Sequence, residues 1–461
     1  MNLDKMKKRK REFGITTTQM IACGFMVVIL IGALLLTLPC MTKSGQWTSF
    51  VDALFMSTTS VCVTGLSLVN VFEYWSFLGQ VVILVLIQIG GIGVVSMTIL
   101  FFMLIGKKVT LKNRLLIQES YNMNSLAGLV RTTKNILKGI AVVETAGALL
   151  YCIQFVPQFG PGRGIWISVF NSVSAFCNAG IDVLGGDSLA QYYGNPLINM
   201  VTMLLIILGG IGFFVWWDTI HVVKKWRKTG IKNCFWKLNL HSKMVITITF
   251  FLIFGGAFAI FLLEYSNPET IGHMTFLEKI QASLFQSVTT RTAGFSTINQ
   301  AELRESTSLI SMILMFIGGS PVGTAGGVKT MTIALIAAST MSVVKGEKEV
   351  VVFRRAIPKE TVRKAIAVFF ISCTALVVMV VLMSLVQDAP LHTIVYEVVS
   401  ALATVGLSKN FTASLNLLGK IIIIVCMYIG RIGPISMLIA FRIRSKQNIK
   451  IHFPEEEVIV G

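Results

Sequence analysis

The chain has 461 residues, of which 54% are hydrophobic and only 13% charged, whereas a soluble domain carries about 25% charged residues. This composition excludes an ordinary soluble enzyme or binding domain. The formal net charge of +18 would suit a nucleic-acid partner, but the basic residues form clusters separated by charge-poor apolar stretches. That alternation is typical of a membrane protein, so we expect no nucleic-acid partner.

Apolar stretches of about 20 residues recur, for example at 19–39 and 244–263, and each is long enough to cross a bilayer as a helix. Basic clusters lie at the N-terminus and at residues 107–138, 224–243, 345–364 and 442–450. Because Lys and Arg collect on the cytoplasmic side, we expect a multi-pass protein of the cell membrane with both termini cytoplasmic. Its basic face also suits anionic lipid headgroups.

Four glycine-bearing stretches mark an internal repeat: TTSVCVTGLS, SAFCNAGID, SVTTRTAGFST and SALATVGLS. The successive distances between their glycines, Gly65, Gly180, Gly294 and Gly406, are 115, 114 and 112 residues. A second marker follows each glycine, in turn IQIGGIG, IILGGIG, MFIGGSPVG and MYIGRIGP. Two markers that recur four times in register predict four copies of one structural unit.

The repeats alternate with basic cytoplasmic segments. In chain order we expect a cytoplasmic N-terminus at 1–18, repeat 1 at 19–105, a loop at 106–135, repeat 2 at 136–221, a loop at 222–243, repeat 3 at 244–341, a loop at 342–364, repeat 4 at 365–441 and a cytoplasmic tail at 442–461. Each repeat begins with a spanning helix, near 19–39, 136–156, 244–264 and 365–386. Each ends with a second one, near 79–105, 197–221, 308–341 and 417–441. Between the two lies an amphipathic stretch of about 12 helical residues, which is too short to span.

The predicted fold is an all-α polytopic membrane protein with four parallel repeats of first helix, pore helix and second helix around a pseudo-fourfold pore. This arrangement has eight transmembrane helices and four re-entrant pore loops, related by an axis along the membrane normal. Non-helical backbone at membrane depth is tolerated only where it is buried in protein or lines water. Pore helices that point their negative ends inward favour a cation, and extended backbone beyond them can turn carbonyl oxygens toward the axis. The four stretches therefore predict a cation filter, in which glycine permits positive φ.

The four stretches resemble the filter motifs of the Trk/Ktr/HKT potassium transporter superfamily, in order and over nearly all of residues 15–445. The resemblance is strongest to the KtrB-type ion-translocating membrane subunit, and TTRTAGF and GGSPVGTAGGVKT are its most specific strings. It implies that main-chain carbonyls at and before each filter glycine coordinate K⁺, the only metal expected. The implied filter residues are Val63, Thr64, Gly65, Asn178, Ala179, Gly180, Thr292, Ala293, Gly294, Thr404, Val405 and Gly406. Glycine stands at all four key positions, whereas some sodium-conducting plant members have serine at the first.

The third repeat departs from the others at residues 317–330, IGGSPVGTAGGVKT, where glycines and a proline break a helix. We expect the other repeats to keep a continuous second helix. The resemblance implies an intramembrane loop below the filter that gates permeation, with a packing kink as the open alternative. The implied gate residues are Gly318, Gly319, Gly323, Thr324, Ala325, Gly326, Gly327 and Lys329, together with Arg431, which replaces the second marker glycine of repeat 4. A charge at this depth needs a partner or water.

Five other charged residues lie at membrane level or at the outer mouth. We expect Glu144, Asp52 and Glu397 to be hydrogen-bond partners between helices, with a role as ion ligands left open. Asp182 is expected near the outer mouth, where it would attract cations, and Arg291 is expected to bond pore-helix carbonyls or a carboxylate. The eight cysteines and five histidines show no metal-binding or catalytic spacing, so we do not expect an enzyme.

Together these features predict the pore-forming subunit of a bacterial potassium uptake system that conducts K⁺ inward, with dependence on Na⁺ (symport) left open. The alternative is a Na⁺-conducting member of the same fold. A transporter for an organic solute would favour inverted repeats, whereas these repeats are parallel. No G-x-G-x-x-G segment opens a soluble βαβ unit, so no cofactor is expected in this chain. The resemblance implies a homodimer and a separate cytoplasmic nucleotide-binding ring of the RCK or KtrA type.

Overall fold

The first helix of each repeat is long and apolar. The computed structural model describes residues 17–93, 97, 129–185, 188–225 and 231–433. Within them, four helices are each long and apolar enough to cross a membrane: α2 (Thr17–Thr37), α8 (Leu129–Phe159), α14 (Leu240–Glu264) and α18 (Lys359–Val386). They confirm the four first spanning helices, and their apolar residues surround the whole helix, as expected in lipid.

A short pore helix follows each first helix, as predicted. The four are α3 (Phe50–Cys62), α9 (Pro161–Cys177), α15 (Phe276–Thr289) and α19 (Leu391–Leu402), with 13, 17, 14 and 12 residues. Local sequence sets where they begin: Pro161 occupies the first turn of α9, and Thr275 and Glu278 form a capping box on α15. Hydrogen bonds from Thr275 lower the pKa of the half-buried Glu278 carboxyl.

The second helix of each repeat is interrupted or ends at a glycine-rich marker. These helices are α5 (Phe77–Ile92), α10 (Pro196–Gly210) with α11 (Phe213–Lys224), α16 (Glu305–Phe316) with α17 (Thr330–Val344), and α20 (Leu417–Ile432). The expected break in repeat 3 is confirmed. The expected continuity of the second helix is wrong in the other three repeats: α10 and α11 meet at an angle of 101°, α5 ends before Gly93 and α20 ends before Gly433. The physical reason is the last glycine of each marker, since Gly93, Gly212 and Gly433 have φ of +92°, +94° and +92°, which no α-helix accommodates. Most of the predicted helix beyond Gly93, and all of it beyond Gly433, lies outside the described residues.

Smaller elements complete the described part of the chain: α4 (Val71–Tyr74), α13 (Ile231–Lys237), three short 3₁₀ turns and one hairpin. The 3₁₀ turns are η1 (Pro39–Met41), η2 (Ala190–Tyr192) and η3 (Thr412–Ser414). In the hairpin, β1 (Val351–Val352) pairs antiparallel with β2 (Arg355–Ala356), with Val351 opposite Ala356. Most of the predicted segments 1–18, 106–135 and 442–461 lies outside the described residues. The predicted boundaries of the repeats stay predictions.

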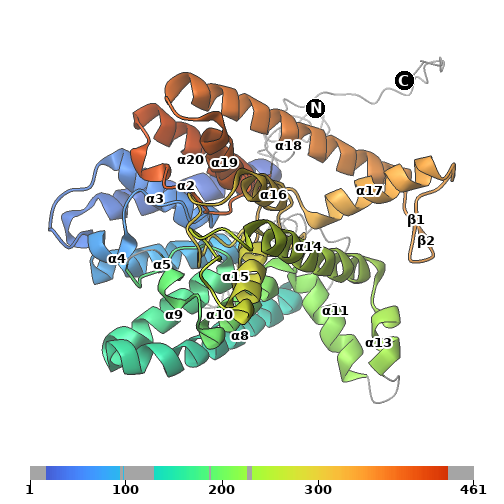
Figure 1. The fold of residues 1–461 in the computed structure, drawn as a ribbon, viewed down its shortest axis with the longest axis horizontal. Helices are drawn as coiled ribbons and strands as arrows, with labels where there is room; N and C mark the ends of the chain where they lie inside the picture. The colour runs from blue at the N-terminus through green and yellow to red at the C-terminus, as the bar shows by residue number, and fades with distance from the viewer. Residues whose placement is uncertain (1–16, 94–96, 98–128, 186–187, 226–230, 434–461) are drawn as a thin grey trace, which may run out of the picture.

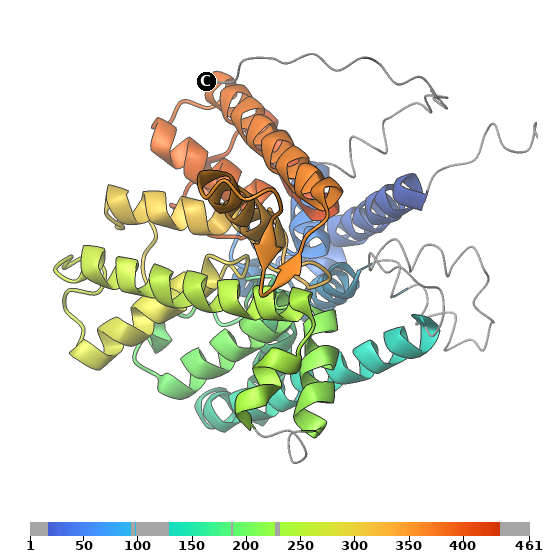
Figure 2. The ribbon, with the colours of Figure 1, turned by 90° about the vertical axis from the view of Figure 1, so that its right-hand side faces the viewer.

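The four repeats follow one another around a common centre (Figures 1 and 2). Each second helix packs against the pore helix of the next repeat, in the pairs α5 with α9, α10 with α15 and α16 with α19. The last pair, α20 with α3, joins repeat 4 to repeat 1. The non-helical segments after the pore helices are therefore held inside a closed ring of helices.

Candidate ion pathway

Each pore helix ends in the same unusual backbone conformation. The residues two positions before the filter glycines, Val63, Asn178, Thr292 and Thr404, have φ between +53° and +71°. The glycines follow with φ of +100° at Gly65, +64° at Gly180, +80° at Gly294 and +95° at Gly406. Positive φ is uncommon outside glycine, so its occurrence twice in each of four segments defines one shared local structure.

The four glycines lie around a common centre, and each approaches a backbone carbonyl of the next repeat. A Cβ atom on Gly180 would lie 2.5 Å from the carbonyl oxygen of Ala293, and one on Gly294 would lie 2.5 Å from that of Val405. In the same way, Gly406 faces the carbonyl oxygen of Thr64, and Gly65 faces that of Ala179. Each glycine thus contacts the residue before the next glycine, and the contacts close a ring. Only glycine leaves room for four backbones to approach so closely.

A hydroxyl on each pore helix braces the filter segment, a feature that the sequence prediction missed. Thr59 and Ser400 accept hydrogen bonds from the amides of Gly65 and Gly406, both at 3.0 Å. Ser174 accepts from the Ile181 amide at 3.1 Å, and Thr289 donates to the Phe295 carbonyl at 2.6 Å. A serine or threonine six residues before the glycine, or five in repeat 3, is the signal that could have identified them.

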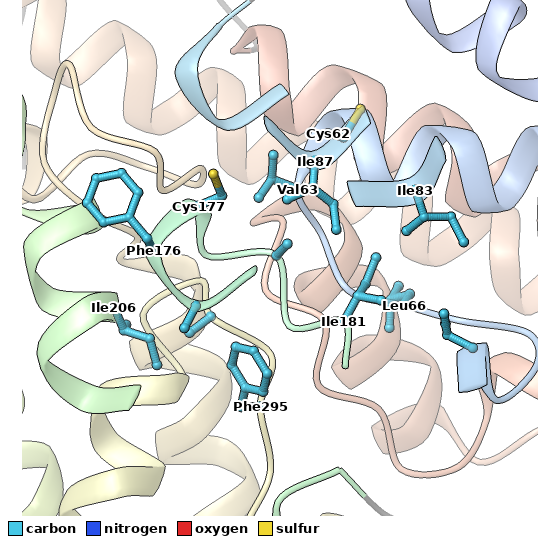
Figure 3. Packing of buried hydrophobic residues seen from close by; sticks show 14 of the residues in the cluster. Cys62, Val63, Leu66, Ile83, Ile87, Phe176, Cys177, Ile181, Ile206 and Phe295 are labelled. Atoms are coloured by element: carbon cyan, nitrogen blue, oxygen red, sulfur yellow. The ribbon is translucent and has the colours of Figure 1, made fainter. Parts of the chain in front are cut away.

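The side chains beside the glycines point into the core rather than toward the centre. The residues that follow them, Leu66, Ile181, Phe295 and Leu407, are 1–2% exposed. Figure 3 shows Leu66, Ile181 and Phe295 among other buried apolar side chains near the ends of the pore helices. Such packing anchors each segment by its side chains and leaves the backbone at the centre.

A cavity of about 390 Å³ opens on the outer side of the filter. All four filter glycines line it, together with hydroxyl and amide side chains that include Ser67, Ser296, Asn299 and Ser408. Asp182 was expected here, but it is not among the described residues that line the cavity. Its carboxylate instead accepts a hydrogen bond from the Leu184 amide at 3.1 Å. The vestibule is thus polar but formed mainly by neutral groups.

The loop between α16 and α17 touches the filter segments from the other side. A Cβ on Gly326 would overlap the Thr404 hydroxyl, and the Thr324 hydroxyl donates to the Phe176 carbonyl at 3.2 Å. The Lys329 ammonium folds back on the loop and donates to the Ala325 carbonyl at 2.7 Å. The predicted gate residues therefore lie together, next to the ends of pore helices α9 and α19.

Arg431 bridges this loop to the first repeat. Its guanidinium donates to the carbonyl oxygens of Thr324 and Gly90, with a further contact of 3.3 Å to Gly91. The last carbonyls of α5 lack partners within their helix, and a cation near a helix C-terminus is favourable. The charge thus has polar partners on both sides, in the place where the other three markers have glycine.

Three of the other membrane-level charges have clear partners. Glu144 on α8 accepts from Gln88 on α5 at 3.0 Å, and this confirms the expected bond between helices. Asp52 on α3 pairs with Lys420 on α20 at 2.6 Å. Glu397 on α19 accepts from the hydroxyls of the loop that follows its own filter segment, Ser408 at 2.6 Å and Thr412 at 2.5 Å. It therefore bonds a loop rather than a second helix.

The expected bond of Arg291 is not found among the described residues. Its side chain is 8% exposed, and its Nε lies buried without a partner beside a small cavity that Gly319 and Thr249 also line. In the described part of the chain, no group of three His, Cys, Asp or Glu side chains could hold a metal ion.

The fold and this site define a multi-pass membrane transport protein built of four pore-loop repeats. The chain belongs to the TrkH family, described as cation transport protein, whose family model matches residues 4–451. It is 40% identical to the Ktr system potassium uptake protein B of Bacillus subtilis (strain 168), in an alignment of 446 residues that covers 97% of each chain. It is 39% identical over 465 residues to the potassium/sodium uptake protein NtpJ of Enterococcus hirae, which covers 99% of each chain.

A solved structure has the same fold. The crystal structure of the potassium transporter TrkH from Vibrio parahaemolyticus matches with a TM-score of 0.72 over 94% of this chain and 86% of that chain, at 18% identity. These comparisons confirm the resemblance and the predicted fold class. The family consists of cation transporters, so the chain is a transport protein and not an enzyme.

Proposed function

We propose that this chain is the pore-forming subunit of a potassium uptake system and conducts K⁺ inward across the cell membrane. The ring of contacts between Gly65, Gly180, Gly294 and Gly406 is the observation that carries the proposal. The names of its relatives support the ion: one is a potassium uptake protein and another a potassium/sodium uptake protein.

The filter acts through its backbone. Carbonyl oxygens at and before each glycine replace the hydration shell of K⁺, and the negative ends of four pore helices favour a cation at the centre. Hydroxyl braces such as Thr59 and Ser400 hold the segments, so the oxygens need not reorganise when the ion arrives. The membrane potential supplies about 2.3 kcal/mol per charge for each 100 mV.

The loop at residues 317–330 serves as the gate in this proposal. Gly318, Gly319, Gly323, Gly326 and Gly327 give it a backbone that packs closely against the ends of α9, α10 and α19. Arg431 and Lys329 add positive charge beside the filter, where it opposes the passage of a cation. The direct bond from Arg431 to Thr324 supports a joint action of charge and loop.

The assembly follows the family resemblance. We propose a homodimer in the cell membrane, with both termini cytoplasmic and a separate nucleotide-binding ring docked on the basic cytoplasmic face. Clusters such as those at 224–243 and 345–364 supply that face.

Uptake of ⁸⁶Rb⁺ and ²²Na⁺ by proteoliposomes tests the ion. With a negative interior potential, we expect ⁸⁶Rb⁺ uptake that excess K⁺ suppresses and excess Na⁺ does not. The second candidate is Na⁺ conduction, which the name of the NtpJ relative favours. Potential-driven ²²Na⁺ uptake that exceeds ⁸⁶Rb⁺ uptake would establish that candidate and overturn the K⁺ assignment, with protein-free liposomes as the baseline.

A further inference from the structure

The bend in the second helix of repeat 2 leaves backbone groups without their helical partners. α10 ends at Gly210 and α11 begins at Phe213. In a continuous helix the Phe213 amide would donate to the Gly209 carbonyl, and the Phe214 amide to that of Gly210. The bend of 101° separates these pairs. Gly209, Gly210 and Phe213 are buried, and an unpaired backbone group in such a place is costly.

The gate loop of repeat 3 supplies partners for three of these four backbone groups. The Thr324 amide donates to the Gly209 carbonyl at 3.1 Å, and the Ser320 amide donates to the Gly210 carbonyl at 2.9 Å. In return, the Phe213 amide donates to the Val322 carbonyl at 3.1 Å. Three backbone groups opened by the bend are therefore satisfied by three backbone groups of the loop.

These two sets of hydrogen bonds exclude each other. Gly209 and Phe213 stand four residues apart and are the natural i to i−4 pair of a straight helix. If the loop leaves, both lose their partners, and closure of the helix restores one bond at once. We infer that the gate loop and the bend at residues 211–212 form one two-state unit, with the loop seated on a bent helix or released from a straight one. This inference rests on the proposed gating function of the loop.

Glycines in both the bend and the loop allow the two backbones to pack closely. A Cβ on Gly212 would lie 2.7 Å from the Pro321 carbonyl oxygen, and one on Gly323 would lie 3.0 Å from that of Gly209. Gly93 occupies the same place in the marker of repeat 1, with a φ of +92°, but no atom of the described residues lies within 4 Å of its Cβ position. It therefore provides a control with the same backbone conformation and without the loop contact.

The Gly212→Ala variant tests the coupling by two measurements. Alanine favours the straight helix over the bent form, because it is about 1 kcal/mol more favourable than glycine inside a helix. That difference corresponds to a factor of about five, so we expect ⁸⁶Rb⁺ uptake to rise about fivefold. The bend is measured as the distance between two spin labels, attached to cysteines that replace the exposed residues Leu204 and Val223. The native cysteines are replaced in this background. A straight helix places these positions about 28 Å apart, and we expect this longer distance to gain population in the variant.

The Gly93→Ala control carries the same backbone strain as Gly212→Ala, but its Cβ meets none of the described residues, the gate loop included. We therefore expect it to change uptake by less than about twofold. If it raises uptake as much as Gly212→Ala does, helix strain alone explains the effect and the inference fails. A straightened helix with unchanged uptake would also overturn it.

Deletion of residues 320–325 separates this inference from the proposed gate. We expect the deletion to raise uptake and to lengthen the distance between the labels. Raised uptake with an unchanged short distance would contradict the two-state unit but support the gating role of the loop. Unchanged uptake would contradict both the gating role and this inference.

Discussion

The filter glycines act through what they lack, a Cβ atom. At Gly294 two constraints coincide: φ is +80°, and the carbonyl oxygen of Val405 lies 2.5 Å from the Cβ position. The first constraint alone is a matter of backbone strain, about 1–2 kcal/mol for a non-glycine residue. The second places a side chain inside the ring of carbonyls, which are the ion ligands in the proposed function.

A pair of substitutions distinguishes the two effects. We expect Gly294→Ser to lower ⁸⁶Rb⁺ uptake at least tenfold and to lower the preference for Rb⁺ over Na⁺, because the hydroxymethyl group enters the filter. Gly160→Ser is the matched control, since Gly160 has a φ of +79° and nothing within 4 Å of its Cβ position. Proteoliposome flux measures both variants, and equal losses would mean that strain rather than position is responsible.

At the scale of elements, the gate loop is held by partners from three other repeats. It contacts the bend of α10 and α11 in repeat 2 and the filter segment of repeat 4. Arg431 then ties it to the end of α5 in repeat 1 through bonds to Thr324 and Gly90. These contacts hold the loop in one position against three other repeats, which is consistent with the gating role proposed for it.

Replacement of Arg431 by Gln should release part of this hold. Hydrogen bonds from a charged group contribute about 1.5–3 kcal/mol, so we expect ⁸⁶Rb⁺ uptake to rise about tenfold or more. Arg431→Lys keeps the positive charge but loses the guanidinium that donates to the carbonyls of both Thr324 and Gly90. It therefore distinguishes repulsion of the permeating cation from the hydrogen bonds between the loop and α5. Arg304→Gln, at an exposed arginine bonded to Ser266, should leave uptake unchanged. Unaltered flux in correctly folded R431Q protein would contradict the barrier role.

At the scale of the whole molecule, the proposed pore requires that the ring of helices close between the first and last repeats. The α20–α3 contact provides that closure, and the Lys420–Asp52 pair at 2.6 Å lies within it. The two side chains are 22% and 38% exposed, so solvent screens the pair and its contribution is modest.

A double-mutant cycle with Lys420→Met and Asp52→Asn measures this contribution. We expect a coupling of about 0.5–1 kcal/mol and a lower temperature for loss of ⁸⁶Rb⁺ uptake after heating in either single variant. Lys364→Met removes the exposed pair with Glu360 inside α18 and should leave that temperature unchanged. A coupling of zero would show that packing of α20 on α3 closes the ring without the ion pair.

Much of this architecture was predictable because local sequence features determine it and recur in four repeats. The short pore helices, the first spanning helices and the filter glycines follow from segment length, apolar content and the need for positive φ. The break in repeat 3 was also predictable, since its glycines and proline are concentrated in one stretch. The helix ends at Gly93, Gly212 and Gly433 were missed because their markers, GGIG and GRIG, carry no proline and only isolated glycines, which an apolar helix tolerates.

The sequence by itself thus determined the unit, its number of copies and the positions where the backbone needs glycine. Only the tertiary structure decided which distant groups meet, as with Glu144 and Gln88, Arg431 and Thr324, or the carbonyls of Gly209 and Gly210 and the gate loop. The reason is physical: backbone conformation depends on near neighbours in the chain, whereas these partners lie tens to hundreds of residues apart. They come together only when four repeats close into a ring.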